Sequence, residues 1–292
     1  MDYLLHVVSL IGIYAILSVS LGFAVGQAGV VNVAHASFYG IGAYATALLM
    51  LGKHAPFPVA LLAGSAIASL AGLVLSWISS RVGAEMLVLT TFGFAVVLTG
   101  LMTNWSSLTG GPSGIPSIPD ASFGTLMVKP GLGSATLIWL CTVVTTGVIA
   151  KLTASPFGRV LRCIREDELL GLAIGRSVVR TRSTACAISS FFAGLAGGLF
   201  ATFSGYIDPS SFSVSEGILV LSMVIIGGTG STAGSALGAA LLVGLPEGFR
   251  LIGVGGPHAS NIRQILYGAL IIILMIWRPK GILGRFELGG ST

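Results

Sequence analysis

The stretch KLTASPFGRVLRCIREDELLGLAIGRSVVRTR, residues 151–182, is the one large charged interruption in an otherwise apolar chain. It holds seven of the 15 lysines and arginines. The 292 residues are 54% hydrophobic and only 9% charged, with a mean hydropathy of +0.95. Soluble domains carry about 25% charged residues, and a soluble domain could not cover itself with so few polar groups. The composition therefore predicts a protein dissolved in a bilayer, with this stretch held on the cytoplasmic side.

Apolar runs of helical length lie on both sides of this stretch. A bilayer core needs roughly 20 apolar residues per helix, and the sequence predicts nine segments at 4–25, 33–51, 59–77, 86–102, 135–152, 184–203, 218–226, 236–245 and 262–277. The seventh and eighth are too short to span simply, and they flank the glycine-rich run 227–234. This run is interpreted as a break between two half-helices, a re-entrant element or a link between two extended spans. We expect an all-α polytopic membrane protein of about 8–10 transmembrane helices, including broken or re-entrant segments.

The distribution of lysine and arginine predicts the orientation. With residues 151–182 inside, alternation of the spans also places Arg81 and the basic residues of the C-terminus inside. Eleven of the 15 basic residues then lie inside and four outside, namely Lys53, Lys129, Arg250 and Arg263. Nine spans would put Met1 outside. The glycine- and proline-rich loop 104–133 would also be outside, either as a simple connector or as a surface that receives an external partner.

Polar residues within or beside the spans are candidates for a translocation pathway, because each is costly in hydrocarbon unless it faces protein or water. The candidates are Gln27, Asn32, His35, Thr90, Thr91 and Asn104. The stretch 26–32 predicts a helix break whose backbone groups could bind a zwitterion, or a structural turn tied off by Asn32. His35 either donates to a substrate or packs as a hydrogen-bonded residue. No span has an acidic residue near its middle, which disfavours an ion-driven secondary carrier.

The chain lacks the sequence motifs of several classes of protein. The chain has no P-loop lysine motif, so any ATP would be bound by another subunit. It has no HExxH motif and no metal-spaced histidine or cysteine cluster, so we expect no metal, no cofactor and no catalytic residue. The basic residues sit at the ends of apolar runs rather than interleaved with aromatics, so we expect no nucleic-acid binding.

Within the charged stretch, a short helix with a basic edge is predicted from Pro156 onward, since proline favours the first helical position. Its apolar contacts would come from Leu161, Ile164, Leu169 and Leu172. Such a helix is suited to docking in a groove of another protein. The alternative is a helix lying on anionic lipid, which the three consecutive acidic residues of the stretch disfavour. Gly171 should cost the helix up to about 1 kcal/mol against alanine.

The run 157–168 followed by 173–175 resembles the coupling region of ABC importer permeases, and specifically the LivM-type permease family of branched-chain amino acid importers. Stretches 26–44, 104–119, 207–212 leading into 227–231, and 278–284 resemble that family in the same order. The resemblance implies an ABC importer permease fold in one transmembrane domain, residues 1–292, with a cytoplasmic coupling loop at 154–182. It implies ATPase-coupling roles for Arg159, Arg162, Arg165, Glu166, Asp167, Glu168, Ala173 and Gly175. The sequence departs from the general importer signature in the two leucines after Glu168 and in Gly175, which lies one residue later.

The resemblance also implies partner proteins and a cellular location. These are a second related permease subunit, two cytoplasmic ABC ATPase subunits, a periplasmic or lipid-tethered substrate-binding protein and membrane lipid, in the bacterial inner membrane. The expected cargo is branched-chain or other aliphatic amino acids. An alternative is the same type of permease importing urea, short amides or another small solute. A third hypothesis, from another class, is a standalone channel or secondary carrier.

Overall fold

A computed structural model describes residues 2–82, 86–123, 126–128, 131–251, 268 and 281–284. The long helices are α1 (Asp2–Ala28), α2 (His35–Lys53), α3 (Phe57–Ser79), α4 (Leu87–Asn104), α6 (Leu132–Ala154), α9 (Val178–Ser204), α10 (Val214–Gly227) and α11 (Thr232–Leu251). The short elements are α5 (Ser106–Thr109), η2 (Gly111–Ser113), α7 (Pro156–Glu166), α8 (Glu168–Ala173), η3 (Pro209–Phe212) and the antiparallel pair β1 (Ser122–Phe123) and β2 (Leu126–Met127).

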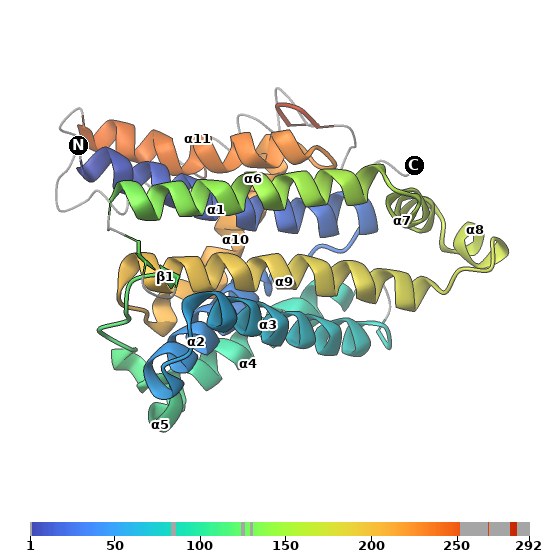
Figure 1. Cartoon of the computed structure of the whole chain (residues 1–292). Helices are drawn as coiled ribbons and strands as arrows, with labels where there is room; N and C mark the ends of the chain where they lie inside the picture. Colours follow the sequence, from blue (N-terminus) through green and yellow to red (C-terminus); the bar gives the residue numbers. More distant parts are fainter. Residues whose placement is uncertain are drawn as a thin grey trace.

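The long helices form a bundle around α1 and α9. Helices α1, α6 and α11 lie on one side of α9, and α2, α3 and α4 lie on the other (Figure 1). In the most apolar stretch of each helix, 61% of α1 and 67% of α9 is buried, against 17% of α4 and 28% of α6. Helices α1 and α9 are therefore central, whereas α4 and α6 offer much of their apolar surface to the surroundings.

The predicted helical fold is confirmed. Among the described residues, α1, α3, α4, α6 and α9 are long and apolar enough to cross a membrane, and α10 and part of α11 are shorter apolar helices. Helix α2 has 19 residues and is largely buried between α3 and α9. The predicted segment 262–277 lies outside the described residues, apart from Gly268.

The glycine-rich run is a turn between two helices. Helix α10 ends at Gly227 and α11 begins at Thr232, so residues 228–231 alone are non-helical. A Cβ on Gly227 would lie 2.0 Å from the carbonyl oxygen of Gly234, so the two helices could not approach this closely with larger residues. The run is therefore a break between helices of 14 and 20 residues, and the second of them is longer than the half-helix of the first predicted alternative.

Glycine also sets the contact between α2 and α9. A Cβ on Gly42 would lie 2.2 Å from the Gly194 carbonyl oxygen, and one on Gly197 would lie 2.0 Å from the Tyr39 carbonyl oxygen. Small residues at such crossings let helix backbones pack closely, which replaces the hydrophobic driving force that is lost in lipid. This packing accounts for part of the high glycine content of the chain.

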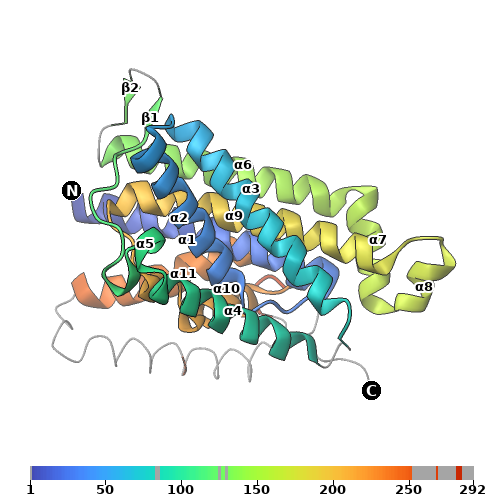
Figure 2. The same cartoon turned by 90° about the horizontal axis from the view of Figure 1, so that it is seen from below.

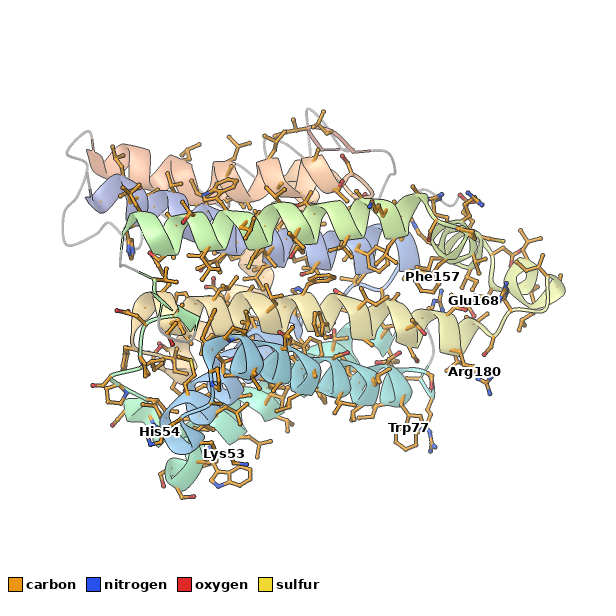
Figure 3. The ribbon with its side chains drawn as sticks, viewed as in Figure 1. Lys53, His54, Trp77, Phe157, Glu168 and Arg180 are labelled. Carbon is orange, nitrogen blue, oxygen red and sulfur yellow. The ribbon has the colours of Figure 1, made fainter. Side chains whose placement is uncertain are left out.

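The two ends of the bundle carry different groups of residues. Lys53 and His54 lie at one end, whereas Trp77, Phe157, Glu168 and Arg180 lie at the other (Figure 3). Helices α7 and α8 project beyond the bundle at that second end, opposite the N-terminus (Figures 1 and 2). We call the end with α7 and α8 the loop end and the other the far end. The Arg81 guanidinium lies 4.0 Å from the centre of the Trp77 ring, so Arg81 and the charged stretch lie at the same end of the bundle.

The far end holds the loop that follows α4. Its Ile115 N–H donates to the Ile207 carbonyl oxygen at 2.9 Å, and the Ile207 N–H donates back at 3.2 Å. The Gly114 φ of +67° favours glycine there, and a Cβ on Gly114 would lie 2.1 Å from the same Ile207 oxygen. The predicted turn-rich loop is therefore tied to the segment before η3.

Candidate functional site

The charged stretch folds into two short helices joined by one residue. Ser155 caps α7, because its hydroxyl accepts from the Gly158 N–H at 3.4 Å, and Pro156 follows at the first helical position as predicted. Asp167 ends α7 and caps α8, since its carboxylate accepts from the Leu169 N–H at 2.8 Å. Both helix starts are thus specified locally by a capping side chain.

Helix α7 is amphipathic, and its apolar side holds it to the bundle. Leu161 and Ile164 are fully buried, at 0% exposure. The arginines at positions 159, 162 and 165 follow the predicted three-residue spacing, but only Arg159 is exposed. The other two arginines turn toward the bundle, so the basic edge of α7 is shared between the surface and an internal contact.

That internal contact joins α7 to the end of α1. Arg162 Nη1 donates to Gln27 Oε1 at 2.8 Å and to the Thr153 carbonyl oxygen at 3.1 Å. Arg165 Nη1 donates to the Gly26 carbonyl oxygen at 2.5 Å. We call Gly26, Gln27, Arg162 and Arg165 the α1–α7 latch. A cation at the C-terminal end of a helix also complements the helix dipole, so the latch stabilises the end of α1.

The latch arginines lie partly out of water. Burial lowers the pKa of Arg165, and the neighbouring Glu166 carboxylate opposes this shift. Gln27 is only 2% exposed, so its side-chain oxygen depends on Arg162 for a hydrogen bond. Removing the arginine would leave a buried acceptor unsatisfied.

The latch also touches the glycine-rich turn. A Cβ on Gly26 would lie 2.5 Å from the Gly230 backbone nitrogen, so the end of α1 rests directly on this turn. On the other side of the turn, the Leu283 N–H donates to the Gly227 carbonyl oxygen at 3.0 Å. The glycine-rich turn therefore lies between the end of α1 and residues 281–284.

Helix α8 packs against α7 through a glycine. A Cβ on Gly171 would lie 2.6 Å from Ile164 Cγ1, so an alanine there would collide with a fully buried side chain. The sequence alone assigned Gly171 only a cost in helix propensity. The structure gives it a packing role, which requires the absence of a side chain.

The outward side of α8 is apolar. Leu169, Leu170 and Ile174 are 72%, 52% and 57% exposed, and we call these three residues the docking face. Glu166 and Asp167 are exposed beside it. Of the four predicted apolar contacts of this stretch, the two on α7 are thus buried against the bundle and the two on α8 are exposed.

The remaining predicted coupling residues lie around the turn into α9. Glu168 forms an ion pair with Arg182 of α9, which sequence reasoning did not single out because 14 residues separate the two. Ala173 and Gly175 are exposed, and the Gly175 φ of +72° favours glycine in the turn.

Three predicted pathway residues surround the connection between α1 and α2. Asn32 Oδ1 accepts from the Ala34 N–H at 3.0 Å, which matches the structural alternative of a turn tied off by this residue. His35 is fully buried, with Nε2 2.9 Å from the Ser20 hydroxyl of α1, so it joins α1 to α2. Thr91 Oγ1 accepts from the Val33 N–H at 3.3 Å and thereby ties α4 to the same connection.

The other three predicted pathway residues lie elsewhere. Gln27 belongs to the latch. Thr90 donates to the Met86 carbonyl oxygen of its own helix at 2.9 Å. Asn104 is exposed at the far end of α4 and donates to the Gly100 carbonyl oxygen at 2.8 Å. The structure therefore does not bring the six residues together into one lining.

The part of the chain that the structure describes holds no group of three or more histidine, cysteine or acidic side chains placed to bind a metal ion. What the loop end offers is a docking face, an internal latch and an ion pair. These features suit the transmission of movement between a partner protein and the bundle.

Comparisons with known proteins identify the family. A family model described as the permease component of branched-chain amino acid transport systems matches residues 3–275. The high-affinity branched-chain amino acid transport permease LivM of Escherichia coli is 33% identical over 93% of this chain and 68% of its own length. LivH of Salmonella typhimurium is 25% identical over 94% of this chain and 92% of its own, and BraD of Pseudomonas aeruginosa is 26% identical over the same two shares. No solved structure matches the chain. The chain therefore belongs to the family of permease components of branched-chain amino acid transport systems.

Proposed function

We propose that this permease component imports branched-chain and other aliphatic amino acids as one transmembrane subunit of an ATP-driven complex in a bacterial inner membrane. The cargo is supported by the names of its relatives, which are high-affinity branched-chain amino acid permeases. The apolar character of the spans also suits a weak corridor for aliphatic solutes, because selection can rest on a separate binding protein.

The observation that carries the coupling role is the docking face. The docking face projects from the loop end, where Leu169 and Leu170 of the six-residue helix α8 and Ile174 directly after it are all exposed. Exposed apolar residues rimmed by charge are typical of protein interaction sites. We propose that the docking face enters a groove on a cytoplasmic ATPase, with Glu166, Asp167 and Arg159 at the rim.

The latch connects the proposed ATPase contact to the membrane-spanning helices. When the two ATPases close on ATP, they would displace α8 and, through the packing of Gly171 on Ile164, also α7. Arg162 and Arg165 would pass this displacement to the end of α1, one of the two central helices. The loop 154–182 thus couples nucleotide binding to the opening of the pathway.

The remaining partners follow from the relatives. LivM and LivH both match this chain over more than 90% of its length, and we propose that a second related permease completes the pathway. A periplasmic or lipid-tethered binding protein would deliver the substrate at the far end, where the loop bridged by Ile115 and Ile207 forms a defined surface.

Two measurements test this function. Affinity purification of the chain from its own membrane should recover a second permease and ATPases with a P-loop motif. The reconstituted complex with its binding protein should take up labelled leucine in an ATP-dependent way and should not take up labelled urea. Recovery of the chain alone from a detergent that preserves such complexes would overturn the importer assignment, and uptake of urea instead of leucine would overturn the cargo.

A further inference from the structure

The loop end contains a cavity that the coupling role does not use. It has a volume of about 720 Å³ and lies between the end of α3, the start of α4, helix α8 and the start of α9. Gly29, Val30 and Val31 of the α1–α2 connection also line it. Its size falls within the roughly 300–1,000 Å³ of small-molecule sites.

The lining combines aliphatic walls with one pair of opposite charges. The apolar walls include Leu75, Leu87, Val88, Leu172, Val178 and Val179. Among the described residues that line the cavity, Glu168 and Arg182 are the only charged ones. The described part of the lining is therefore mainly apolar, and its one positive and one negative group balance each other.

The two charged groups form an ion pair with each other, and this pair is weak because its side chains reach solvent. The Glu168–Arg182 pair joins α8 to α9, and its side chains are 52% and 25% exposed. Ion pairs that reach solvent contribute little to stability, so the pair separates at little cost. Arg182 binds Glu168 through Nη1, while its buried Nε has no hydrogen-bond partner among the described residues. A carboxylate that bound Arg182 side-on would satisfy this Nε.

A second unpartnered group belongs to a residue that lines the same cavity. The buried hydroxyl of Ser79 makes no hydrogen bond within the described part of the chain, and Ser79 lines the cavity. Buried polar groups are normally hydrogen-bonded. The Ser79 hydroxyl oxygen and the Arg182 Nε are both buried and both belong to side chains that line the cavity, so a small polar ligand that displaced the present side-chain positions could supply their missing partners.

We infer that this cavity is a loop-end binding site for the zwitterion of an aliphatic amino acid. Arg182 binds the carboxylate, Glu168 binds the ammonium group, and the side chain packs against the walls formed by α3 and α4. This inference rests on the proposed function and deepens it, because it assigns the imported solute a site on the cytoplasmic side.

The charge balance favours a zwitterion over a lipid. One cation and one anion match the two charged ends of an amino acid. An anionic lipid headgroup would be repelled by Glu168, because sites for such headgroups carry an excess of basic side chains. The two binding charges also lie on different helices. Displacement of α8 by an ATPase would move Glu168 away from Arg182, so the same movement that opens the pathway would change the affinity of this site.

The test uses the whole complex in proteoliposomes. The three native cysteines are replaced by alanine, Ser79→Cys is introduced, and the rate of its modification by a maleimide is measured with and without leucine. At a leucine concentration of about ten times its Kd, occupancy should slow the modification about tenfold. Ser80→Cys provides a second position in the lining should the first variant fail to fold. Thr181→Cys on α9, outside the lining, is the matched control and should react at the same rate with and without leucine.

Ligand analogues and substitutions of the two charged residues test which charges of leucine the site binds. The carboxylate 4-methylpentanoate and the amine 3-methylbutylamine each lack one charge of leucine and should not slow the modification. Glu168→Gln and Arg182→Gln should each abolish the protection by leucine. Unchanged reactivity with leucine, or equal protection by the singly charged analogues, would overturn the inference. Protection by anionic vesicles without leucine, compared with phosphatidylcholine vesicles, would assign the cavity to a lipid and overturn it as well.

Uptake by the unmodified complex separates the two claims. Active leucine uptake together with an unprotected thiol would refute the loop-end site and leave the proposed function standing. An active complex that takes up another solute and not leucine would refute the proposed cargo itself.

Discussion

The α1–α7 latch makes a quantitative prediction for Arg162. Lysine keeps the charge but has no planar fork, so we expect Arg162→Lys to keep one of the two hydrogen bonds to Gln27 and Thr153. A hydrogen bond from a charged group contributes about 1.5–3 kcal/mol, and we take the lower value because Arg162 is only partly buried. If this bond is needed when α7 drives α1, its loss should reduce transport about tenfold, since 1.4 kcal/mol corresponds to a factor of ten.

The assay compares leucine uptake with ATP hydrolysis in reconstituted complexes. Arg162→Lys should lower the number of leucine molecules transported per ATP while the ATPase stays bound. Arg180→Lys is the matched control, because it makes the same change at an exposed arginine at the start of α9, which belongs neither to the latch nor to the rim of the docking face. A wild-type ratio for Arg162→Lys would refute the latch as the route of coupling.

A double-mutant cycle separates the latch from a general loss of stability. We expect Gln27→Leu and Arg162→Ala each to lower the free energy of unfolding in mixed micelles, by about 1–3 kcal/mol. Because both remove the same contact, their combined effect should fall short of the sum by about 1–2 kcal/mol. Strict additivity would contradict the direct bond seen between the two side chains.

Three further predictions concern the loop end and the far end. Leu169→Glu should weaken ATPase binding at least about tenfold without changing thermal stability, as measured by co-purification and a melting curve. Gly171→Ala should lower the melting temperature despite the better helix propensity of alanine, because its Cβ would meet Ile164; an increase would contradict this packing. Burial acts to raise the pKa of Asp208, but hydrogen bonds from Ser210 and Ser211 outweigh it and hold the pKa below its ordinary value. Asp208 should therefore stabilise the fold above about pH 4 and lose this contribution as the pH falls through its folded pKa, and Asp208→Asn should remove that part of the pH dependence in melting curves.

The membrane character and the order of the helices could be predicted because both depend on properties that are local in sequence. Runs of apolar residues and the bias of lysine and arginine need no knowledge of packing. The start of α7 was equally predictable, since Ser155 and Pro156 act within one turn. The break at 227–234 could be located but not resolved among its alternatives, because its shape depends on the approach of Gly227 to Gly234 and of Gly26 to Gly230.

The site was less predictable because its contacts join distant parts of the chain. The spacing of the three arginines predicted that they share one side of α7. It did not reveal that Arg162 and Arg165 bind residues of α1 that lie more than 130 positions earlier in the chain. Gln27 carried a signal, since it is a polar residue near the end of an apolar helix, yet its partner could not be inferred. Gly171 was misjudged because helix propensity is local, whereas its reason, the buried Ile164, becomes visible only in the packed pair of helices.

The central claim is that α8 is the contact of this permease with its ATPase, and site-specific photocrosslinking in the native membrane tests it most directly. A benzophenone side chain at Leu169, on the docking face, should yield an adduct with a P-loop ATPase. The same group at Leu140, which is 63% exposed on α6, should not. An ATPase adduct at position 140 and none at position 169, in a complex that transports leucine, would contradict the account.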